Sequence, residues 1–278
     1  HVAQVLRRLR RICAAYGGDP VFILASATVA DPGATAGRLI GAEVTTVTAD
    51  ASPRGELAIG MWEPPLTSYT GEQGAPVRRP ATAETADLLA DLVVDDVRTL
   101  AFVRSRRGVE TVAARASELV AEVDPELVGR IDSYRGGYLP EERRALEESL
   151  RSGRLVGMAA TNALELGIDV SGLDAVLVTG YPGTRAAFWQ QIGRAGRDAG
   201  GALGLFVARD DPLDTYLVHH PEALLGKPVE GTVFDTDNPY VLGPHLCAAA
   251  QERPITTADF ELFGPRTREV LGGLVEQG

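Results

Sequence analysis

The stretch Gln190-Gln191-Ile192-Gly193-Arg194-Ala195-Gly196-Arg197 decides how the rest of this 278-residue chain is interpreted. It lies between two apolar runs, Ala175–Val178 and Leu203–Val207, and we expect it to form a short helix. Arg194 and Arg197 are three residues apart, so both guanidinium groups would lie on one helical face, where their forked donors suit phosphate oxygens. Each glycine costs about 1 kcal/mol of helix stability relative to Ala. The two glycines therefore predict that something approaches the backbone closely here.

Apolar runs alternate with helix-like segments along most of the chain, which predicts an α/β fold. The runs are continuously apolar, as expected for parallel strands that are covered by helices on both faces. The expected strands are residues 21–25, 44–48, 57–62, 99–103, 131–134, 155–160, 175–178 and 203–207, and the expected helices are residues 2–16, 34–40, 83–94, 106–123 and 140–153. Residues 64–80 are rich in Pro, Gly, Ser and Thr, so we expect an exposed loop there.

The bulk composition is that of a globular chain, because 45% of the residues are hydrophobic and can bury real cores. No apolar run approaches about 18 residues and no signal peptide is recognisable, so we expect no membrane association and a cytoplasmic location. Cys13 and Cys247 are far apart in sequence, which fits a reducing compartment and predicts no cysteine zinc site. Beyond Asp210 the sequence is helix-rich with its own small core, and we expect a boundary near residues 221–237.

The net charge of −11 argues at first against a nucleic-acid partner, but the charge is unevenly distributed. Residues 210–278 carry 12 acidic and four basic side chains, so this segment alone contributes −8. The remaining residues are close to balanced, and Arg7, Arg8, Arg10 and Arg11 cluster near the start. Because local patches decide phosphate binding, nucleic acid remains a candidate partner.

The chain contains no phosphate loop of the G-x-x-x-x-G-K-[ST] kind. Lys227 is its single lysine, and this residue follows Leu224-Leu225-Gly226 and precedes Pro228. Neither the preceding glycine spacing nor the following residue fits a loop that cradles phosphates. A nucleotide bound through such a loop would therefore need residues outside this sequence.

Hydroxyl groups and a basic residue follow two of the expected strands. Ser26 and Thr28 come directly after residues 21–25, and Arg104 and Ser105 come after residues 99–103. In an open parallel sheet, ligands bind outside the carboxyl ends of the strands, so these side chains occupy a functional edge. The plainer alternatives are a turn with an N-cap at Ser26, a helix cap at Ser105, and a solvated arginine at Arg104.

Two further strand ends carry polar residues. Arg135 and two glycines follow the strand at residues 131–134, which permits close approach of a ligand or simply makes a tight turn. Thr161 and Asn162 follow the strand at residues 155–160, with Asp169 eight residues after Thr161. Thr161 and Asn162 can donate to a nucleic-acid backbone, and Asp169 can accept from a ribose hydroxyl or hold an arginine. A helix cap is the alternative at this second site.

Taken together, these segments resemble the motifs of superfamily 2 DEAD/DEAH-box helicases. Residues 26–28 are similar to the SAT motif, 102–105 to the fourth motif, 161–169 to the fifth, and 190–197 to the Q-x-x-G-R-x-G-R sixth motif. Residues 134–144 and 160–169 look most like the RecQ4-like group, which includes the mitomycin-repair helicases of bacteria and fungi. Residues 238–246 resemble the entry to the winged-helix region of that group.

The resemblance implies a role for each of these residues. Arg194 and Arg197 would be arginine fingers that stabilise charge on the ATP γ-phosphate, and Gln190 would position the nucleotide or the attacking water. The nucleotide side would be lined by Gly167, Asp169 and Gly193, while Thr161, Asn162, Arg104, Ser105 and Arg135 would contact the nucleic-acid backbone. Ser26 and Thr28 would couple hydrolysis to strand movement.

The resemblance also implies an arrangement of domains. Residues 1–56 would end a first RecA-like domain, residues 57–222 would form a second, with a parallel sheet covered by helices on both faces, and residues 223–278 would begin a winged-helix-like domain. The phosphate-loop and Asp-Glu-x-His motifs would lie upstream of His1. The chain would then belong to a 3′-to-5′ DNA helicase or translocase and, alone, would not hydrolyse ATP or bind it tightly.

The partners implied are ATP with Mg²⁺ in the full-length enzyme, the first RecA-like domain, and single-stranded DNA, with RNA as an alternative. Two other functions remain open. The chain could be an inert RecA-like module that binds nucleic acid or protein. A dinucleotide-binding oxidoreductase is the second alternative, and it is disfavoured because no G-x-G-x-x-G follows the first strand.

Overall fold

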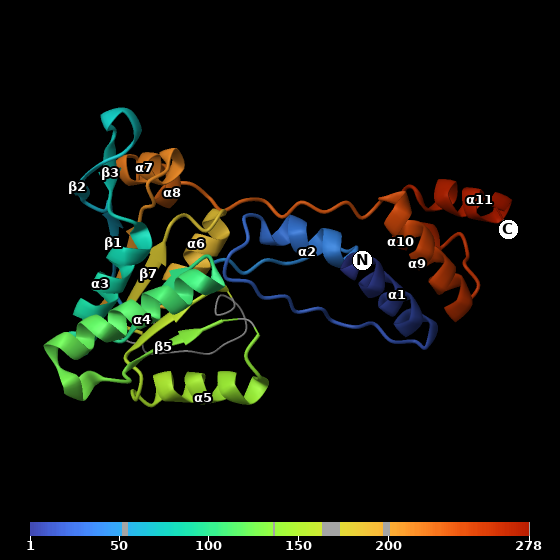
Figure 1. Cartoon of the computed structure of the whole chain (residues 1–278). Coiled ribbons are helices and arrows are strands. Elements are labelled where there is room, and N and C mark those ends of the chain that lie inside the picture. The colour runs from blue at the N-terminus through green and yellow to red at the C-terminus, as the bar shows by residue number, and fades with distance from the viewer. Residues whose placement is uncertain (52–54, 136, 163–172, 197–200, 278) are drawn as a thin grey trace. The chain divides into compact units, whose positions relative to one another are not determined.

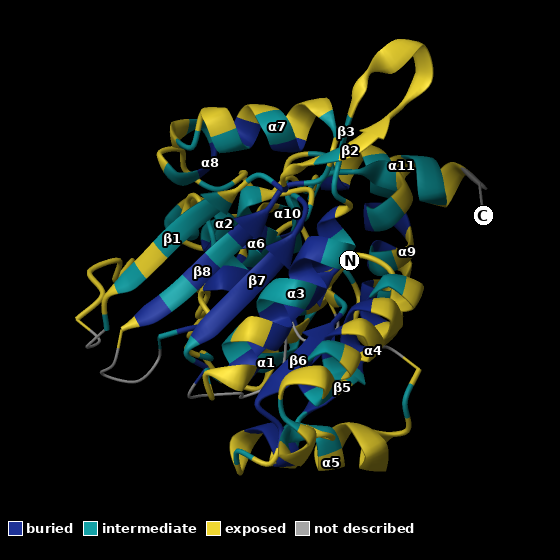
Figure 2. Ribbon diagram, turned by 60° about the vertical axis from the view of Figure 1, so that its left-hand side comes forward, coloured by how far each residue is buried: buried dark blue, intermediate teal, exposed yellow. Residues whose placement is uncertain are grey.

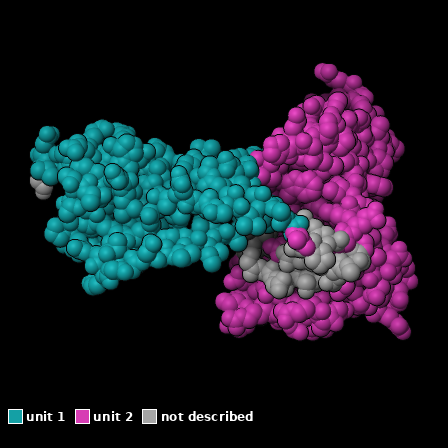
Figure 3. Space-filling view, turned by 180° about the vertical axis from the view of Figure 1, so that it is seen from behind, with its two compact units in different colours: residues 1–50, 230–278 teal, residues 51–229 magenta. Residues whose placement is uncertain are grey.

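The computed structural model describes residues 1–51, 55–135, 137–162, 173–196 and 201–277 (Figure 1). Its contacts divide the chain into two compact units, unit 1 with residues 1–50 and 230–278, and unit 2 with residues 51–229 (Figure 3). The sequence analysis treated the first and last segments separately, whereas the structure packs them into one unit. The boundary between residues 229 and 230 lies inside the expected interval of residues 221–237.

Unit 2 is built on a parallel sheet, as predicted. Its six strands lie in the order β1 (Leu57–Trp62), β8 (Ala202–Val207), β7 (Ala175–Thr179), β4 (Thr99–Val103), β6 (Gly157–Ala160) and β5 (Ile131–Tyr134). Every neighbouring pair is parallel, so all six strands end at the same edge. The residues that follow these strands are therefore brought together even though they are far apart in sequence.

Helices cover both faces of the sheet, which confirms the expected α/β architecture. They are α3 (Ala81–Val94), α4 (Arg106–Val123), α5 (Pro140–Arg151), α6 (Arg185–Ile192), α7 (Pro212–His219) and α8 (Glu222–Leu225). Along β4, Leu100 and Phe102 pack in a core with α5 to α8, while Ala101 and Val103 pack in a core with α3 and α4. Both faces of the central strands are buried (Figure 2). This two-sided burial is why the strands are continuously apolar.

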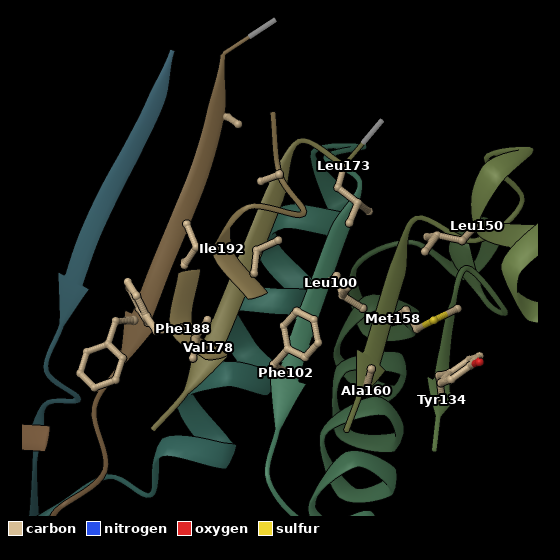
Figure 4. Close-up of a cluster of buried hydrophobic side chains, with 14 of the residues drawn as sticks. Leu100, Phe102, Tyr134, Leu150, Met158, Ala160, Leu173, Val178, Phe188 and Ile192 are labelled. Carbon is tan, nitrogen blue, oxygen red and sulfur yellow. The ribbon is translucent and has the colours of Figure 1, made fainter. Parts of the chain in front are cut away.

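Helix α6 lies close to the sheet because a glycine makes room for it. Phe188 and Ile192 of α6 are fully buried in the core that Figure 4 shows. A Cβ atom at Gly204 of β8 would lie 2.7 Å from the Ile192 side chain, closer than real contacts allow. The close approach fixes α6 against β8, and α6 leads directly into Arg194.

The expected loop at residues 64–80 is instead a small hairpin. Strands β2 (Leu66–Thr70) and β3 (Pro76–Arg78) pair antiparallel around the 3₁₀ turn η1 (Glu72–Gly74). Gln73 and Gly74 have positive φ angles of 56° and 80°, which let the chain reverse within a few residues. The sequence analysis counted Thr67 and Thr70 as loop residues and left Tyr69 out of account, although Thr and Tyr favour strands. The predicted exposure is observed over most of the hairpin.

Unit 1 is helical. It contains α1 (Val2–Ala15), α2 (Pro32–Ile40), α9 (Pro239–Glu252), α10 (Asp259–Phe263) and α11 (Thr267–Gln277). The second 3₁₀ turn, η2 (Pro125–Leu127), belongs to unit 2. The core of unit 1 contains Leu242, Leu246, Ala249 and Phe263. The expected separate core beyond Asp210 is therefore present from α9 onward, and it packs against α1.

Two expected strands are wrong. Residues 21–25 and 44–48 have no regular secondary structure, and Val21, Ile23 and Val47 are 86%, 92% and 91% exposed. A parallel strand is stable only where a neighbour pairs with its backbone. Within the part of the chain that the structure describes, neither segment pairs with a strand. Apolar composition alone was therefore insufficient.

Candidate nucleic-acid interface

Two of the predicted backbone-contact residues meet at one hollow in unit 2. Arg104 follows β4 and Asn162 follows β6, and both line a small hollow at the carboxyl edge of the sheet. Gly180 and Pro182, which follow β7, form another part of its lining, and Gln191 of α6 completes it. The hollow thus combines a guanidinium with amide groups at the edge where parallel sheets bind ligands.

Arg104 is the accessible cation of this hollow. Its side chain is exposed, and no carboxylate within the described residues lies at ion-pair distance. A guanidinium is always charged and offers up to five donors, which matches the oxygens of a phosphate group. Arg104 can therefore bind an anion without first breaking an internal ion pair.

Ser105 acts as a helix cap, which is the plainer of its two expected roles. The Gly108 amide donates to Ser105 Oγ at 3.0 Å and thereby satisfies one of the open donors at the start of α4. The hydroxyl hydrogen remains a possible donor to a second group. A direct contact from Ser105 to nucleic acid stays a prediction.

Arg135 lies outside the hollow lining and is engaged within unit 2. Its Nε lies 2.7 Å from Glu110 Oε1, and its guanidinium lies 5.1 Å from the centre of the Tyr138 ring. A phosphate contact would have to compete with this ion pair and this cation–π contact. Thr161 donates its amide to Tyr134 O at 3.2 Å, so its backbone continues the pairing of β5 with β6.

Tyr134 is the last residue of β5, and its side chain is buried. Its hydroxyl donates to Glu147 Oε1 at 3.0 Å. Burial, reinforced by this hydrogen bond and by the charge of Glu147, raises the pKa of Tyr134 to about 12. The phenol therefore remains a neutral donor that ties α5 to the strand preceding Arg135.

The helix expected at residues 190–197 ends early. Helix α6 stops at Ile192, Gly193 forms its C-cap, and Gly196 has a left-handed φ of 75°. Arg194 therefore follows the helix and does not lie on a helical face as expected, and Arg197 lies outside the described residues. The groups that approach the glycines belong to the protein itself, since a Cβ atom would lie 2.9 Å from Trp189 O at Gly193 and 2.9 Å from Ala202 at Gly196. Glycine is needed here to end the helix and to turn the backbone that follows it.

Arg194 is buried, with 7% of its surface exposed, and its amide donates to Gln191 O at 3.1 Å. Gln190 is half-buried on α6. The predicted residues Gly167, Asp169 and Arg197 lie outside the described residues. The finger and nucleotide roles of this segment therefore stay predictions.

Ser26 and Thr28 belong to unit 1, in a segment without regular secondary structure. The Thr28 amide donates to Ser26 Oγ at 3.3 Å, which makes a local hydroxyl-capped turn. This geometry matches the plainer alternative for Ser26. The coupling role of the two residues stays a prediction.

Comparison with known proteins identifies the chain. A model of the helicase conserved C-terminal domain matches residues 84–199. The chain is 41% identical over its whole length to the uncharacterized ATP-dependent helicase YprA of Bacillus subtilis, and 40% identical over 92% of its length to the ATP-dependent helicase HRQ1 of Saccharomyces cerevisiae. The chain contains a superfamily 2 helicase C-terminal domain.

A solved structure carries the same helicase domain. The crystal structure of the DUF1998 helicase MrfA bound to DNA superposes with a TM-score of 0.91 over the whole chain, at 40% sequence identity. The chain covers 36% of YprA, 24% of HRQ1 and 36% of MrfA, so it spans about a third or less of these proteins. The match confirms the RecA-like helicase fold and the expected resemblance to the RecQ4-like group.

Several residues of the helicase domain that line the hollow were missed by the sequence analysis. Gln191 was passed over in favour of Gln190, although Gln191 is 1% exposed and lines the hollow. The helical period contained the signal, because Phe188 and Ile192 mark the buried face and Gln191 lies on that same face. Gly180 and Pro182 were missed because the turn after β7 matches none of the recognised motifs.

No helix in the part of the helicase chain that the structure describes is both long enough and apolar enough to span a bilayer.

Proposed function

We propose that this chain is part of an ATP-dependent DNA helicase or translocase and that the hollow at the carboxyl edge of unit 2 contacts the backbone of single-stranded DNA. The observation that carries the proposal is the meeting of Arg104 and Asn162, from two different strands, in one hollow. An exposed guanidinium and an amide suit phosphate and sugar oxygens, which make up most protein contacts to nucleic acid. All 278 residues of this chain match part of MrfA, whose crystal structure shows it bound to DNA. RNA is the alternative strand, and the assays below include it.

We propose that Arg194 and Arg197 stabilise the charge on the ATP γ-phosphate during hydrolysis, and that Gln190 positions the nucleotide or the attacking water. Arg194 is 7% exposed, and stabilisation of developing charge requires donors that are shielded from water and already oriented. ATP with Mg²⁺ would supply the phosphoryl group to be transferred. Gly193, and Gly167 and Asp169 of the fifth motif, would line the nucleotide. This chain contributes no phosphate loop, since its single lysine is Lys227.

We propose the same division into domains that the motifs imply. Unit 2 is the second RecA-like domain, and the segment before it completes the first. Support comes from α1 and the segments that follow it, whose apolar side chains Val5, Val21, Ile23 and Val47 are exposed. Such side chains are expected to be covered by more of a RecA-like domain. Residues 223–278 would begin the winged-helix-like domain.

ATP hydrolysis by the full-length protein tests the assignment. With single-stranded DNA present, Arg194→Ala and Arg197→Ala should each lower kcat by at least about 10³-fold while leaving DNA affinity nearly unchanged. Arg151→Ala is the matched control, because Arg151 lies on α5 with its side chain 57% exposed. Since Arg194 is buried, the unfolding midpoint of each variant is measured alongside. Wild-type kcat in both variants would show that neither arginine is a finger.

The 278-residue chain alone should show negligible ATPase activity, because a phosphoryl-transfer site needs a phosphate cradle and a metal-holding acid. Robust DNA-stimulated turnover by this chain would contradict the proposal. A full-length protein that binds single-stranded DNA or RNA but never hydrolyses ATP would identify the inert binding module instead.

A further inference from the structure

Asp214 is a carboxylate with no solvent exposure near the carboxyl edge of the sheet in unit 2. It lies in the first turn of α7, where Asp211 caps the helix by accepting from the Leu213 and Asp214 amides at 3.1 and 2.9 Å. A buried carboxylate is costly unless hydrogen bonds and a counter-charge replace its hydration. The partners of Asp214 therefore show what this residue holds in place.

Those partners come from the turns after two neighbouring strands. The Tyr181 amide, which follows β7, donates to Asp214 Oδ1 at 3.2 Å. Arg209, which follows β8, donates its amide to Asp214 Oδ2 at 2.9 Å and its Nε to the same oxygen at 3.1 Å. One side chain thus ties the turn after β7 to the turn after β8.

Gly180 brings these two turns into direct contact. Its φ is +75°, its amide donates to Val207 O at 2.8 Å, and a Cβ atom there would lie 2.3 Å from Arg209 Nε. The Arg209 side chain therefore rests on the backbone of the turn while Asp214 holds its Nε. Arg209 also pairs with Asp211 at 2.9 Å, which fixes the far side of the guanidinium.

The turn held in this way is one wall of the hollow. Gly180 and Pro182 line it together with Arg104 and Asn162, which follow two other strands. Two residues later Thr184 caps α6 by accepting from the Ala187 amide at 3.0 Å. A shift of the turn would therefore change the width of the hollow and the start of α6 together.

We propose that Asp214 is a positioning residue for binding single-stranded nucleic acid. Through Tyr181 and Arg209 it holds the turn of residues 180–182 at the separation from Arg104 that a strand backbone requires. Asp214 does not touch the strand itself. This inference rests on the proposed function, since it takes the hollow to be the site of backbone contact.

The test is Asp214→Asn in the full-length protein, assayed by ATP hydrolysis at increasing concentrations of single-stranded DNA. The amide keeps the shape of the carboxylate, removes its charge, and turns an NH₂ group toward donors. The DNA concentration at half-maximal stimulation should rise about tenfold, because a binding site tolerates only sub-ångström displacement of its walls. The kcat at saturating DNA should stay within about twofold, because the fingers are untouched. Asp210→Asn, an exposed carboxylate four residues earlier, should change neither quantity.

A second variant guards against misfolding. Gly180→Ala displaces the same turn from the Arg209 side without altering the carboxylate, and it should raise the half-saturating DNA concentration in the same way. Folding of each substitution is followed in the 278-residue chain by the fluorescence of Trp62 and Trp189, which both lie in unit 2. A folded Asp214→Asn protein with wild-type half-saturation, or one that loses only kcat, would overturn the proposal. Unfolding of both variants would assign Asp214 a purely structural role and would also overturn it.

Failure of the positioning role can be told apart from failure of the proposed function. If Arg104→Ala and Asn162→Ala weaken DNA binding while Asp214→Asn does not, the positioning role fails and the hollow stands. If Arg104→Ala and Asn162→Ala also leave DNA binding unchanged, the hollow is not the contact site and both proposals fall.

Discussion

In unit 1, Arg11 of α1 is 8% exposed, and its guanidinium donates to the carbonyl oxygens of Ala249, Arg253 and Pro254 at 2.8, 2.9 and 2.7 Å. The same group pairs with Asp259 at 2.8 Å. In unit 2, Arg104 is exposed and lines the small hollow at the carboxyl edge of the sheet. The first arginine closes the end of α9, where a cation meets unpaired carbonyls and the negative end of the helix dipole. The second remains available to a ligand.

Arg7 and Arg10 of α1 donate to backbone carbonyls, as Arg11 does. Arg7 is buried and donates to Phe263 O at 2.9 Å, and burial lowers its pKa, an effect that the charge of Asp237 opposes and that of Arg10 adds to. Arg10 donates to Ile40 O and Gly41 O at 2.8 Å each and so closes the end of α2. The arginine cluster that balanced the charge of the sequence therefore stabilises unit 1. Clustering in sequence did not distinguish a phosphate patch from a set of helix caps.

The largest effect is expected from Arg11→Ala. Removing a buried partner of Asp259, along with three carbonyl contacts, should lower the free energy of unfolding of unit 1 by about 3–5 kcal/mol. Both tryptophans lie in unit 2, so urea unfolding followed by far-UV circular dichroism should show an early helical transition that tryptophan fluorescence does not report. In contrast, Arg104→Ala should change the unfolding free energy by no more than about 0.5 kcal/mol. Equal losses in the two variants would break the comparison.

For DNA affinity, we expect the substitution at Arg104 to have a clear effect. In the full-length protein, Arg104→Ala should weaken binding of single-stranded DNA about tenfold and reduce the slope of log affinity against log salt by about 0.7, the value for one phosphate contact. Fluorescence anisotropy of a labelled oligonucleotide measures both quantities. Arg115→Ala is the control, because Arg115 is an exposed arginine of α4 that pairs with Glu118 at 3.3 Å. If Arg115→Ala weakened binding as much, the effect would be one of general charge.

A smaller effect is expected from acid. Burial raises the pKa of Asp259, but hydrogen bonds from Arg11 and Thr256 and the charge of Arg11 outweigh it, so the pKa lies below its ordinary value. A carboxylate with a lowered folded pKa stabilises the fold above its unfolded pKa of about 3.9 and loses that contribution as the pH falls through its folded pKa. Unit 1 should therefore lose stability below about pH 4, and Asp259→Asn should flatten this dependence. Unfolding midpoints by circular dichroism between about pH 3 and pH 6 measure the slope. An unchanged slope in Asp259→Asn would show that another group carries the acid sensitivity.

The smallest effect is expected from Arg8→Ala. Arg8 pairs with Glu252, and the hydrogen bond from Arg8 lowers the Glu252 pKa, but the two side chains are 23% and 31% exposed. Pairs open to solvent contribute little, so the free energy of unfolding should fall by no more than about 1 kcal/mol. A loss as large as that for Arg11→Ala would show that burial is not what separates Arg8 from Arg11.

Much of unit 2 could be predicted because its elements carry local signals. The expected bounds of β1, β4 and β5 agree with the structure, and Ser105 caps α4 as its position before the helical pattern indicated. Gln191 and the turn at Gly180 could not be placed in the hollow so directly, because the order of strands in the sheet decides which turns face each other. The role of Asp214 could not be predicted for the same reason, since its hydrogen-bond donors follow two different strands.

The sequence by itself determined that α1 would be a helix with an apolar stripe and an arginine stripe, and that unit 2 would be a parallel sheet between helices. Only the tertiary structure decided which stripe of α1 is buried. Arg7 and Arg11 are covered while Val2, Val5 and Leu9 are 64%, 50% and 48% exposed, the reverse of the usual amphipathic pattern. The reason is that open carbonyls of α9 and its neighbours, more than 230 residues away in sequence, compete for the guanidinium groups. The spacing of apolar and charged residues along one helix carries no information about partners so distant in the sequence.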